Sequence, residues 1–287
     1  MRGTVVMVHC MWGGSWIWDR YAPLFEQRGW RCLRPVLRHH DVDPAAPPDA
    51  RLGSVSLLDY AADLEAYVRG LGEPPVLLGH SMGGLLSMML AARGLGKAAA
   101  LLTPGSPAGV NALTGSVLRS FSGVLFRPSF WKTPMRLSFK SAMYAMLGTL
   151  PPEEQRATYA RLVHESGRAA CELGFWQLDR RHATRIDPAG IRCPVLIVSA
   201  SDDRLTPASV VRKTAGYLGA KAELREFPGH GHWVVGEPGW EEIAGFVADW
   251  LERNAGGAAA RPGGGAAAPW RGSEPRSGSQ ERRPGGG

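Results

Sequence analysis

The sequence VLLGHSMGG at residues 76–84 decides the fold. Here an apolar, β-rich run ends in the pattern G-x-S-x-G, and a helix-forming run follows at once. In this strand–turn–helix context the pattern acts as a nucleophile elbow. The turn is so tight that Ser81 needs small residues two positions before and after it, and Gly79 and Gly83 supply them. We therefore expect the Ser81 hydroxyl to project from the end of a strand, at the N-terminus of a helix, which favours developing negative charge.

Strand and helix signals alternate along much of the chain. Continuous apolar runs, typical of parallel strands buried on both faces, lie at 4–8, 97–103 and 193–198. Apolar side chains at helical spacing lie at 16–28, 56–71 and 240–253. This alternation predicts an α/β fold with a doubly wound, mostly parallel sheet.

The alternation stops between residues 106 and 187, where helix-like pieces are rich in aromatic residues and methionine. We interpret this stretch as a helical cap inserted into a core made of residues 1–105 and 188–254. The aromatic and methionine side chains of the cap either line an apolar pocket over Ser81 or form the core of the cap itself. Residues 255–287 are rich in Gly, Ala, Pro and Arg, and we expect them to form a disordered tail.

Composition favours a globular protein in the cytoplasm. The 287 residues can bury a sizeable core, and the hydrophobic content is 44%. No apolar run is long enough for stable membrane insertion, and the N-terminus opens on a strand-like run rather than a signal peptide. The four cysteines are widely spaced and form no C-x-x-C, which favours reduced thiols over disulfides or zinc.

The formal net charge of +7 is a weak argument for a nucleic-acid partner. Five arginines and two glutamates after Ala255 account for +3 of that charge. The rest of the chain is only mildly basic. We therefore expect no nucleic-acid partner, and the sequence leaves the oligomeric state open.

Partners for a nucleophilic serine follow two later strands. A serine hydroxyl needs a base to take its proton and a third group to orient that base. Asp202 and Asp203 come directly after the apolar run at 193–198, and His230 and His232 come after the last predicted strand, 221–227. Both loops fall at the carboxyl ends of strands, where open α/β sheets place their ligand sites. The order serine, acid, histidine is the one that accompanies a nucleophile elbow.

With these motifs, the chain from Met1 to about Asn254 resembles α/β-hydrolase-fold serine hydrolases of the esterase/lipase-like branch. The resemblance implies that Asp203 is the acid, because it stands four residues before Pro207. It also implies that His232 is the base, because a Gly-His pair there precedes an aromatic residue.

The resemblance further implies an oxyanion hole made of two backbone amides. One belongs to Met82, directly after the nucleophile, and the other comes from the loop after the first strand. Relatives usually carry His-Gly-x-x-Gly in that loop, whereas this chain reads HCMWG at residues 9–13. We choose Met11 as the second donor, although Cys10 replaces the usual Gly. Trp12, next to this donor, is the residue best placed to bind substrate.

Two histidine clusters invite a metal interpretation. His39, His40 and Asp41 are consecutive, so their side chains point in different directions, and a solvated or mouth-lining loop is the favoured reading. His230 and His232 also resemble a metal pair, but the triad explains one of them. We expect neither a metal nor another cofactor.

The leading hypothesis is hydrolysis of a carboxylic ester, or a related acyl bond, of a small apolar substrate through an acyl-Ser81 intermediate. One alternative is a non-hydrolytic enzyme on the same fold, such as a hydroxynitrile lyase, perhydrolase or acyltransferase. Another is a hydrolase-like receptor that binds a ligand as a signal. The sequence does not distinguish an ester from a thioester, lactone or amide substrate.

Overall fold

A parallel sheet forms the centre of the protein, which is described here by a computed structural model covering residues 1–125 and 127–255. Within this part of the chain, six strands pair in the order β2-β1-β3-β4-β7-β8, and every neighbouring pair is parallel. Their bounds are β1 (Gly3–Val8), β2 (Trp30–Leu33), β3 (Val76–His80), β4 (Ala98–Leu102), β7 (Val195–Ala200) and β8 (Ala222–Phe227). Strands β1, β3, β4 and β7 are buried along their whole length, as their apolar runs require. The predicted fold class is confirmed.

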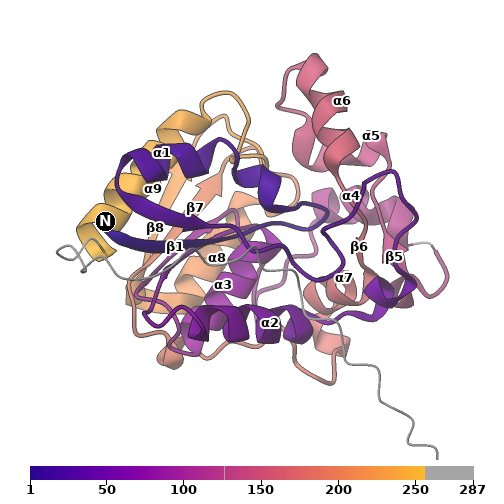
Figure 1. Cartoon of the computed structure of the whole chain (residues 1–287). Helices are drawn as coiled ribbons and strands as arrows, with labels where there is room; N and C mark the ends of the chain where they lie inside the picture. Colours follow the sequence, from indigo (N-terminus) through magenta and orange to yellow (C-terminus); the bar gives the residue numbers. More distant parts are fainter. Residues whose placement is uncertain (126, 256–287) are drawn as a thin grey trace, which may run out of the picture.

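Helices cover both faces of the sheet (Figure 1). One face carries α1 (Tyr21–Gln27) and α9 (Trp240–Ala255). The other carries α2 (Leu57–Arg69), α3 (Met82–Ala92) and α8 (Ala208–Leu218). Short 3₁₀ turns lie at Ser15–Trp18, Ala50–Ser54, Phe130–Lys132, Trp176–Leu178, Pro188–Gly190 and Gly219–Lys221. The helical layers leave the carboxyl ends of the strands open to the remaining segment.

The first helix is shorter than its apolar spacing predicts. In place of one helix over 16–28, the chain makes a 3₁₀ turn at Ser15–Trp18 and begins α1 at Tyr21. Pro23 explains the break. In a continuous helix, Pro23 would have no N–H to donate to the carbonyl of Asp19, and its ring would clash with that carbonyl. Proline is tolerated in the first turn of a helix.

The segment between β4 and β7 lies beyond the carboxyl ends of the strands (Figure 1). It contains α4 (Gly115–Leu125), α5 (Phe139–Ala142), a π-helical turn (Met143–Leu147), α6 (Pro152–Arg161) and α7 (Gly167–Gly174). It also contains an antiparallel pair, β5 (Pro134–Met135) and β6 (Glu165–Ser166), where the sequence showed no strand signal. Each strand of this pair has two residues, too few for an alternating pattern. The bounds of this segment as a separate cap, 106–187, stay a prediction.

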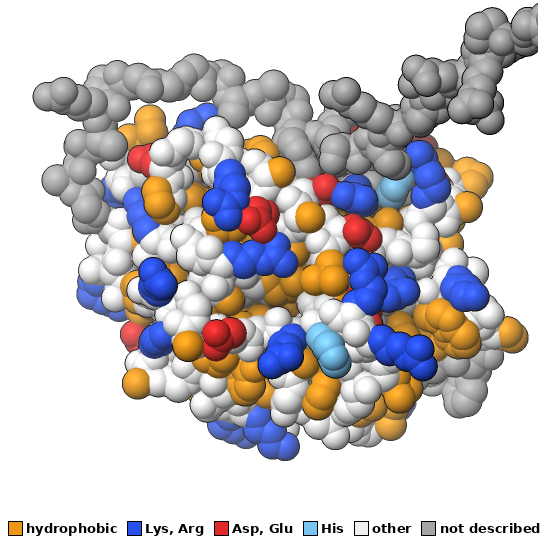
Figure 2. All heavy atoms as spheres, turned by 90° about the horizontal axis from the view of Figure 1, so that it is seen from below, with side chains coloured by type: hydrophobic (Ala, Val, Ile, Leu, Met, Phe, Trp, Pro, Cys, Tyr) orange, Lys and Arg blue, Asp and Glu red, His pale blue; other side chains and the backbone are white. Residues whose placement is uncertain are grey.

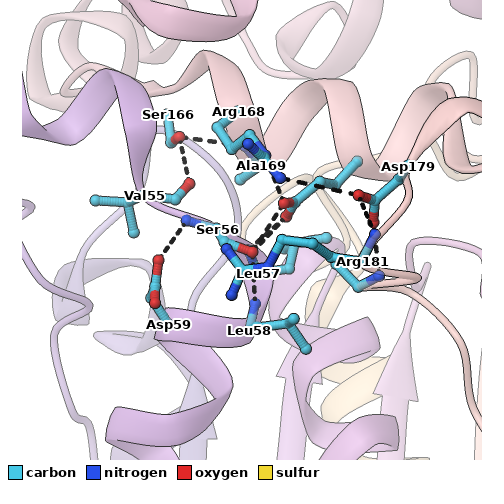
Figure 3. Close-up of polar contacts among 12 residues, drawn as sticks. Val55, Ser56, Leu57, Leu58, Asp59, Ser166, Arg168, Ala169, Asp179 and Arg181 are labelled. Carbon is cyan, nitrogen blue, oxygen red and sulfur yellow. Dashed lines mark hydrogen bonds and ion pairs between the residues drawn. The ribbon is translucent and has the colours of Figure 1, made fainter.

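A buried carboxylate joins this segment to the core. Glu172 on α7 is buried, and it accepts hydrogen bonds from Ser56 Oγ and from the backbone N–H of Leu57, each at 2.8 Å. It thereby caps the N-terminus of α2 from a distant part of the chain. The neighbouring Ser166 donates to the carbonyl of Val55 at 2.6 Å (Figure 3). The segment is therefore held on its α7 side by buried polar contacts.

Charged and apolar side chains are interspersed on one face of the protein (Figure 2). Figure 2 shows Lys and Arg scattered over one face, with apolar side chains and a few acidic ones between them. The absence of a nucleic-acid partner stays a prediction. None of the described helices combines the length and apolar character needed to cross a membrane. The predicted tail lies, beyond Ala255, outside the described residues.

Candidate active site

Ser81 lies on a strained turn between β3 and α3. Its φ is +57° and its ψ is −119°, a conformation that an L-residue adopts only when its surroundings enforce it. A Cβ on Gly79 would lie 2.1 Å from the carbonyl oxygen of Gly83, and one on Gly83 would lie 2.2 Å from that of Val8. Both positions therefore require glycine, as the motif predicts.

Three side chains from separate loops form a hydrogen-bonded chain. The Nε2 atom of His232 lies 2.9 Å from Ser81 Oγ, and its Nδ1 lies 2.8 Å from Asp203 Oδ2. Asp203 can only accept at Nδ1, so it fixes the tautomer that leaves Nε2 as an acceptor for the serine hydroxyl. The structure thus brings together the three residues that the sequence predicts to be nucleophile, base and acid. Their catalytic roles are taken up under the proposed function.

Asp203 is buried, and four hydrogen bonds hold it. Besides His232, it accepts from the backbone N–H of Leu205 at 2.7 Å, from that of Thr206 at 2.8 Å, and from Thr206 Oγ1 at 2.7 Å. Burial by itself raises the pKa of this carboxyl, but His232 and the Thr206 donors outweigh it, and the net pKa lies below the ordinary value. Asp203 is therefore a carboxylate at neutral pH. Its neighbour Asp202 is exposed and accepts a hydrogen bond from Ser201 Oγ at 2.8 Å.

Thr206 does not cap the helix that follows it. A Thr-Pro pair is typical of an N-cap and a first helical residue, but α8 begins at Ala208 and Pro207 is its N-cap. The amide and hydroxyl of Thr206 bind Asp203 instead of the helix. The hydroxyl and N–H groups that could cap a helix are here used as hydrogen-bond donors to the aspartate.

The other histidine of the pair, His230, contacts a carboxylate rather than Ser81. His230 Nδ1 lies 3.0 Å from Glu237 Oε1, and the same buried carboxylate accepts from the backbone N–H of Gly231 at 3.0 Å. Thr149 of the inserted segment also donates to Glu237. Glu237 therefore holds the loop that carries His232. The sequence analysis did not identify Glu237, and the available signal was an acidic residue five positions after His232.

His80, the variable residue before the nucleophile, was also missed. Its Nε2 lies 2.8 Å from the carbonyl oxygen of His232, to which it donates. Burial, and then the nearby His232, lower the pKa of His80 to about 3, so its ring is neutral. His80 thus holds the backbone of the histidine loop without adding charge beside the base.

Two backbone amides are free to bind an anion near Ser81. Among the described residues, the N–H groups of Met11 and Met82 have no hydrogen-bond partner. Met11 and Ser81 line the same cavity, and the end of β1 approaches α3 so closely that Gly83 is required. Unpaired amides beside a nucleophile can stabilise the oxyanion of a tetrahedral intermediate.

An apolar cavity opens beside Ser81. It is narrow and opens to solvent. Side chains from α4 and α7 form much of its wall, together with residues from the loops around the elbow. These wall residues include Val117, Leu118, Phe121, Val124, Ala170 and Leu173. Aromatic side chains of the inserted segment therefore do line the space over the serine, at least for Phe121, Phe130 and Phe175.

Trp12 lies behind this wall. It is buried, and its ring packs against that of Phe121 with 5.9 Å between centroids, but it is not among the residues that line the cavity. Its φ of +62° is strained for a bulky residue, and its carbonyl accepts from Val163 N–H at 2.8 Å. Substrate contact by Trp12 stays a prediction.

The cluster of His39, His40 and Asp41 is predicted to be a solvated or mouth-lining loop, and the structure differs at its middle residue. His40 is buried, and its Nε2 lies 3.1 Å from Glu165 Oε2 on β6. The prediction is wrong for His40 because a carboxylate 125 positions away in the sequence supplies its partner. His39 Nδ1 lies 3.3 Å from Asp49. Among the described residues, no group of three or more His, Cys, Asp or Glu could hold a metal ion.

The chain belongs to the alpha/beta hydrolase family, whose sequence pattern matches residues 5–246. This confirms the resemblance drawn from the sequence motifs. A comparison with curated proteins finds no significant match.

Solved structures of low sequence identity share the fold. A monoacylglycerol lipase from Paleococcus ferrophilus is 23% identical, with a TM-score of 0.64 over 87% of this chain and 94% of that one. A pyrethroid hydrolase from Sphingobium faniae JZ-2 is 18% identical, with a TM-score of 0.66 over 87% and 97%. A variant of tomato methylketone synthase I complexed with beta-ketoheptanoate is 14% identical, with a TM-score of 0.66 over 88% and 98%.

Proposed function

We propose that the chain is a serine hydrolase that cleaves a carboxylic ester, or a related acyl bond, of a small apolar substrate. One observation carries the proposal: the hydrogen-bonded chain Ser81–His232–Asp203 ends at the wall of an apolar cavity. Perturbed and buried polar groups that converge on such a cavity are the usual mark of an active site. Solved structures of the same fold that are named as a lipase and a pyrethroid hydrolase support the reaction class.

Each group has a task in this reaction. His232 takes the proton of Ser81 as the hydroxyl attacks the acyl carbon, and Asp203 stabilises the imidazolium that forms. The amides of Met11 and Met82 would bind the oxyanion, each worth about 3 kcal/mol toward the transition state. His232 then protonates the leaving alcohol, and water releases the acyl group from Ser81 by the same steps. In this scheme the inserted segment acts as a cap whose apolar wall receives the acyl group.

Two measurements test the proposal. A fluorophosphonate probe should label Ser81 covalently, and an activated ester such as p-nitrophenyl butyrate should give a burst equal to the enzyme concentration. A receptor that only binds its ligand would give a labelled site without turnover, or no label at all. An acyltransferase would pass the acyl group to an added alcohol in preference to water. Absence of both label and turnover contradicts the proposal.

The cavity wall makes a prediction about acyl chain length. Gly174 lines the cavity, and a Cβ placed there meets no atom within 4 Å, so we expect the side chain of Gly174→Leu to fill part of the cavity. We expect kcat/KM for an octanoate ester to fall about tenfold, while that for an acetate ester changes little, because a lost methylene contact is worth about 1–3 kcal/mol.

Gly123→Leu is the matched control. Gly123 lies on α4 with equally open space around its Cβ, but it is exposed and does not line the cavity. It should leave the chain-length profile unchanged. An unchanged profile in Gly174→Leu would mean that the acyl group binds elsewhere.

A further inference from the structure

His9, at the end of β1, is buried, and both of its ring nitrogens are engaged. Its Nε2 lies 3.0 Å from the backbone N–H of Leu37, and its Nδ1 lies 2.8 Å from the carbonyl oxygen of Cys10. An N–H group can only donate and a carbonyl can only accept. The ring is therefore neutral, with its proton on Nδ1 donated to Cys10. Burial, and then the charge of His40, lower the pKa of His9 to about 3, which agrees with that state.

The carbonyl that His9 holds belongs to the same peptide unit as the Met11 amide. In a trans peptide the C=O and the following N–H point in opposite directions. The Cys10 carbonyl accepts from His9 and also from Gly13 N–H at 3.3 Å. Its direction is thus fixed from two sides, and the free N–H of Met11 points the opposite way. Met11 itself lines the cavity beside Ser81.

The turn that contains this peptide is under strain. Residues 10–13 form a tight turn closed by the bond from Gly13 N–H to Cys10, and the third residue, Trp12, has a φ of +62°. A positive φ at the third position is the mark of a type II turn, which normally carries Gly there. A bulky residue in that conformation is strained. Such a turn keeps its shape only where other contacts hold its peptides.

We propose that His9 is a positioning residue for the oxyanion hole: its Nδ1–H holds the Cys10 carbonyl so that the Met11 N–H faces the reacting oxygen. The inference rests on the proposed function and adds a residue to it that has no contact with substrate.

A charged pair beside His9 supports this arrangement. His40 Nδ1 lies 3.0 Å from the carbonyl of Arg38, and its Nε2 faces the Glu165 carboxylate, so both ring nitrogens meet acceptors and both carry protons. The resulting imidazolium has its ring 5.2 Å from that of His9. A cation at this distance disfavours a second charge on His9, which keeps Nε2 available to Leu37. Glu165 comes from the inserted segment. That segment therefore helps to keep His9, in the loop after β1, uncharged.

Two substitutions separate the two hydrogen bonds of His9. An asparagine amide reaches the place of Nδ1, so His9→Asn can keep the donor to Cys10 and loses the acceptor for Leu37. A glutamine amide reaches the place of Nε2, so His9→Gln keeps the acceptor and loses the donor. Each variant removes one buried hydrogen bond, so their losses of stability should be similar.

The expected result is a difference in kcat between the two. We expect kcat of His9→Gln on p-nitrophenyl butyrate to fall about 100-fold with KM little changed, because loss of one oxyanion donor costs about 10²–10³ in rate. His9→Asn should stay within about fivefold of the wild type. A trifluoromethyl ketone, which binds as a tetrahedral oxyanion adduct, should lose affinity for His9→Gln in proportion to kcat. Equal losses in the two variants, or a larger loss in His9→Asn, would overturn the proposal.

A second variant keeps the test decisive if His9→Gln does not fold. Met11→Pro removes the N–H itself, and proline is favoured at the second position of a type II turn. It should reproduce the 100-fold loss with His9 intact, and full activity in Met11→Pro contradicts the proposal. If the wild type neither turns over ester nor labels at Ser81, the proposed function fails and this inference with it. Normal wild-type activity with an unaffected His9→Gln refutes the positioning role alone.

Discussion

We expect Ser81→Ala to abolish turnover, with kcat about 10⁶-fold below that of the wild type, which is the loss typical of a triad nucleophile. In the proposed mechanism the hydroxyl oxygen of Ser81 forms the bond to the acyl group, and alanine supplies no nucleophile in its place. Alanine adds no bulk to the strained turn, so the fold should persist. The measurement is steady-state turnover of an activated ester, with circular dichroism to show that the variant is folded.

Ser87→Ala provides the matched control for this variant. Ser87 lies on α3, the helix that follows the nucleophile, and it is likewise buried. Its hydroxyl has no hydrogen-bond partner among the described residues, so its removal leaves no partner unpaired. Activity should remain near that of the wild type. Residual activity above about 1% in Ser81→Ala would remove Ser81 from the mechanism, given the loss expected of a nucleophile.

Asp203→Asn should lower kcat about 10⁴-fold, as loss of the orienting carboxylate does in a serine protease. An asparagine can turn an N–H toward His232 Nδ1, which then becomes an acceptor and leaves the proton on Nε2. In that tautomer the ring cannot take the proton of Ser81. The geometry of the site is otherwise preserved, because asparagine has the shape of aspartate.

Asp202→Asn is the neighbouring control. Asp202 is exposed, and its side chain bonds Ser201, while its backbone N–H donates to the carbonyl of His230 at 2.9 Å. The substitution leaves that backbone bond in place, so kcat should be nearly normal. Comparable losses in the two variants, or a larger loss in Asp202→Asn, would refute the assignment of the acid.

Much of the fold could be predicted because it depends on local patterns. The buried strands read as apolar runs, and the elbow at Ser81 is encoded within nine consecutive residues. The order of serine, acid and histidine is also a property of the chain, and the loops were located from the strands that precede them. The apolar spacing before α1 predicts a continuous helix, but Pro23 breaks it, and there the spacing is misleading.

The groups that support the site could not be predicted in this way. His40 and Glu165 are 125 positions apart, and neither carries a local signal of the other. Glu237 and Thr206 bind the loops of the histidine and the acid through hydrogen bonds that only the folded chain brings together. Such pairs depend on tertiary geometry, which periodicity and motif spacing do not record.

The buried carboxylates that join the inserted segment to the core limit how this protein can be recombined. β4 and β7 are neighbours in the sheet, so a chimaera could replace the segment between them with that of another family member without changing the sheet register. The grafted segment would remove Glu165 and Glu172, and leave His40 and Ser56 buried without their acceptors. An unpaired buried charge costs several kcal/mol. A functional graft must therefore carry these carboxylates with it, or replace His40 and Ser56 in the recipient.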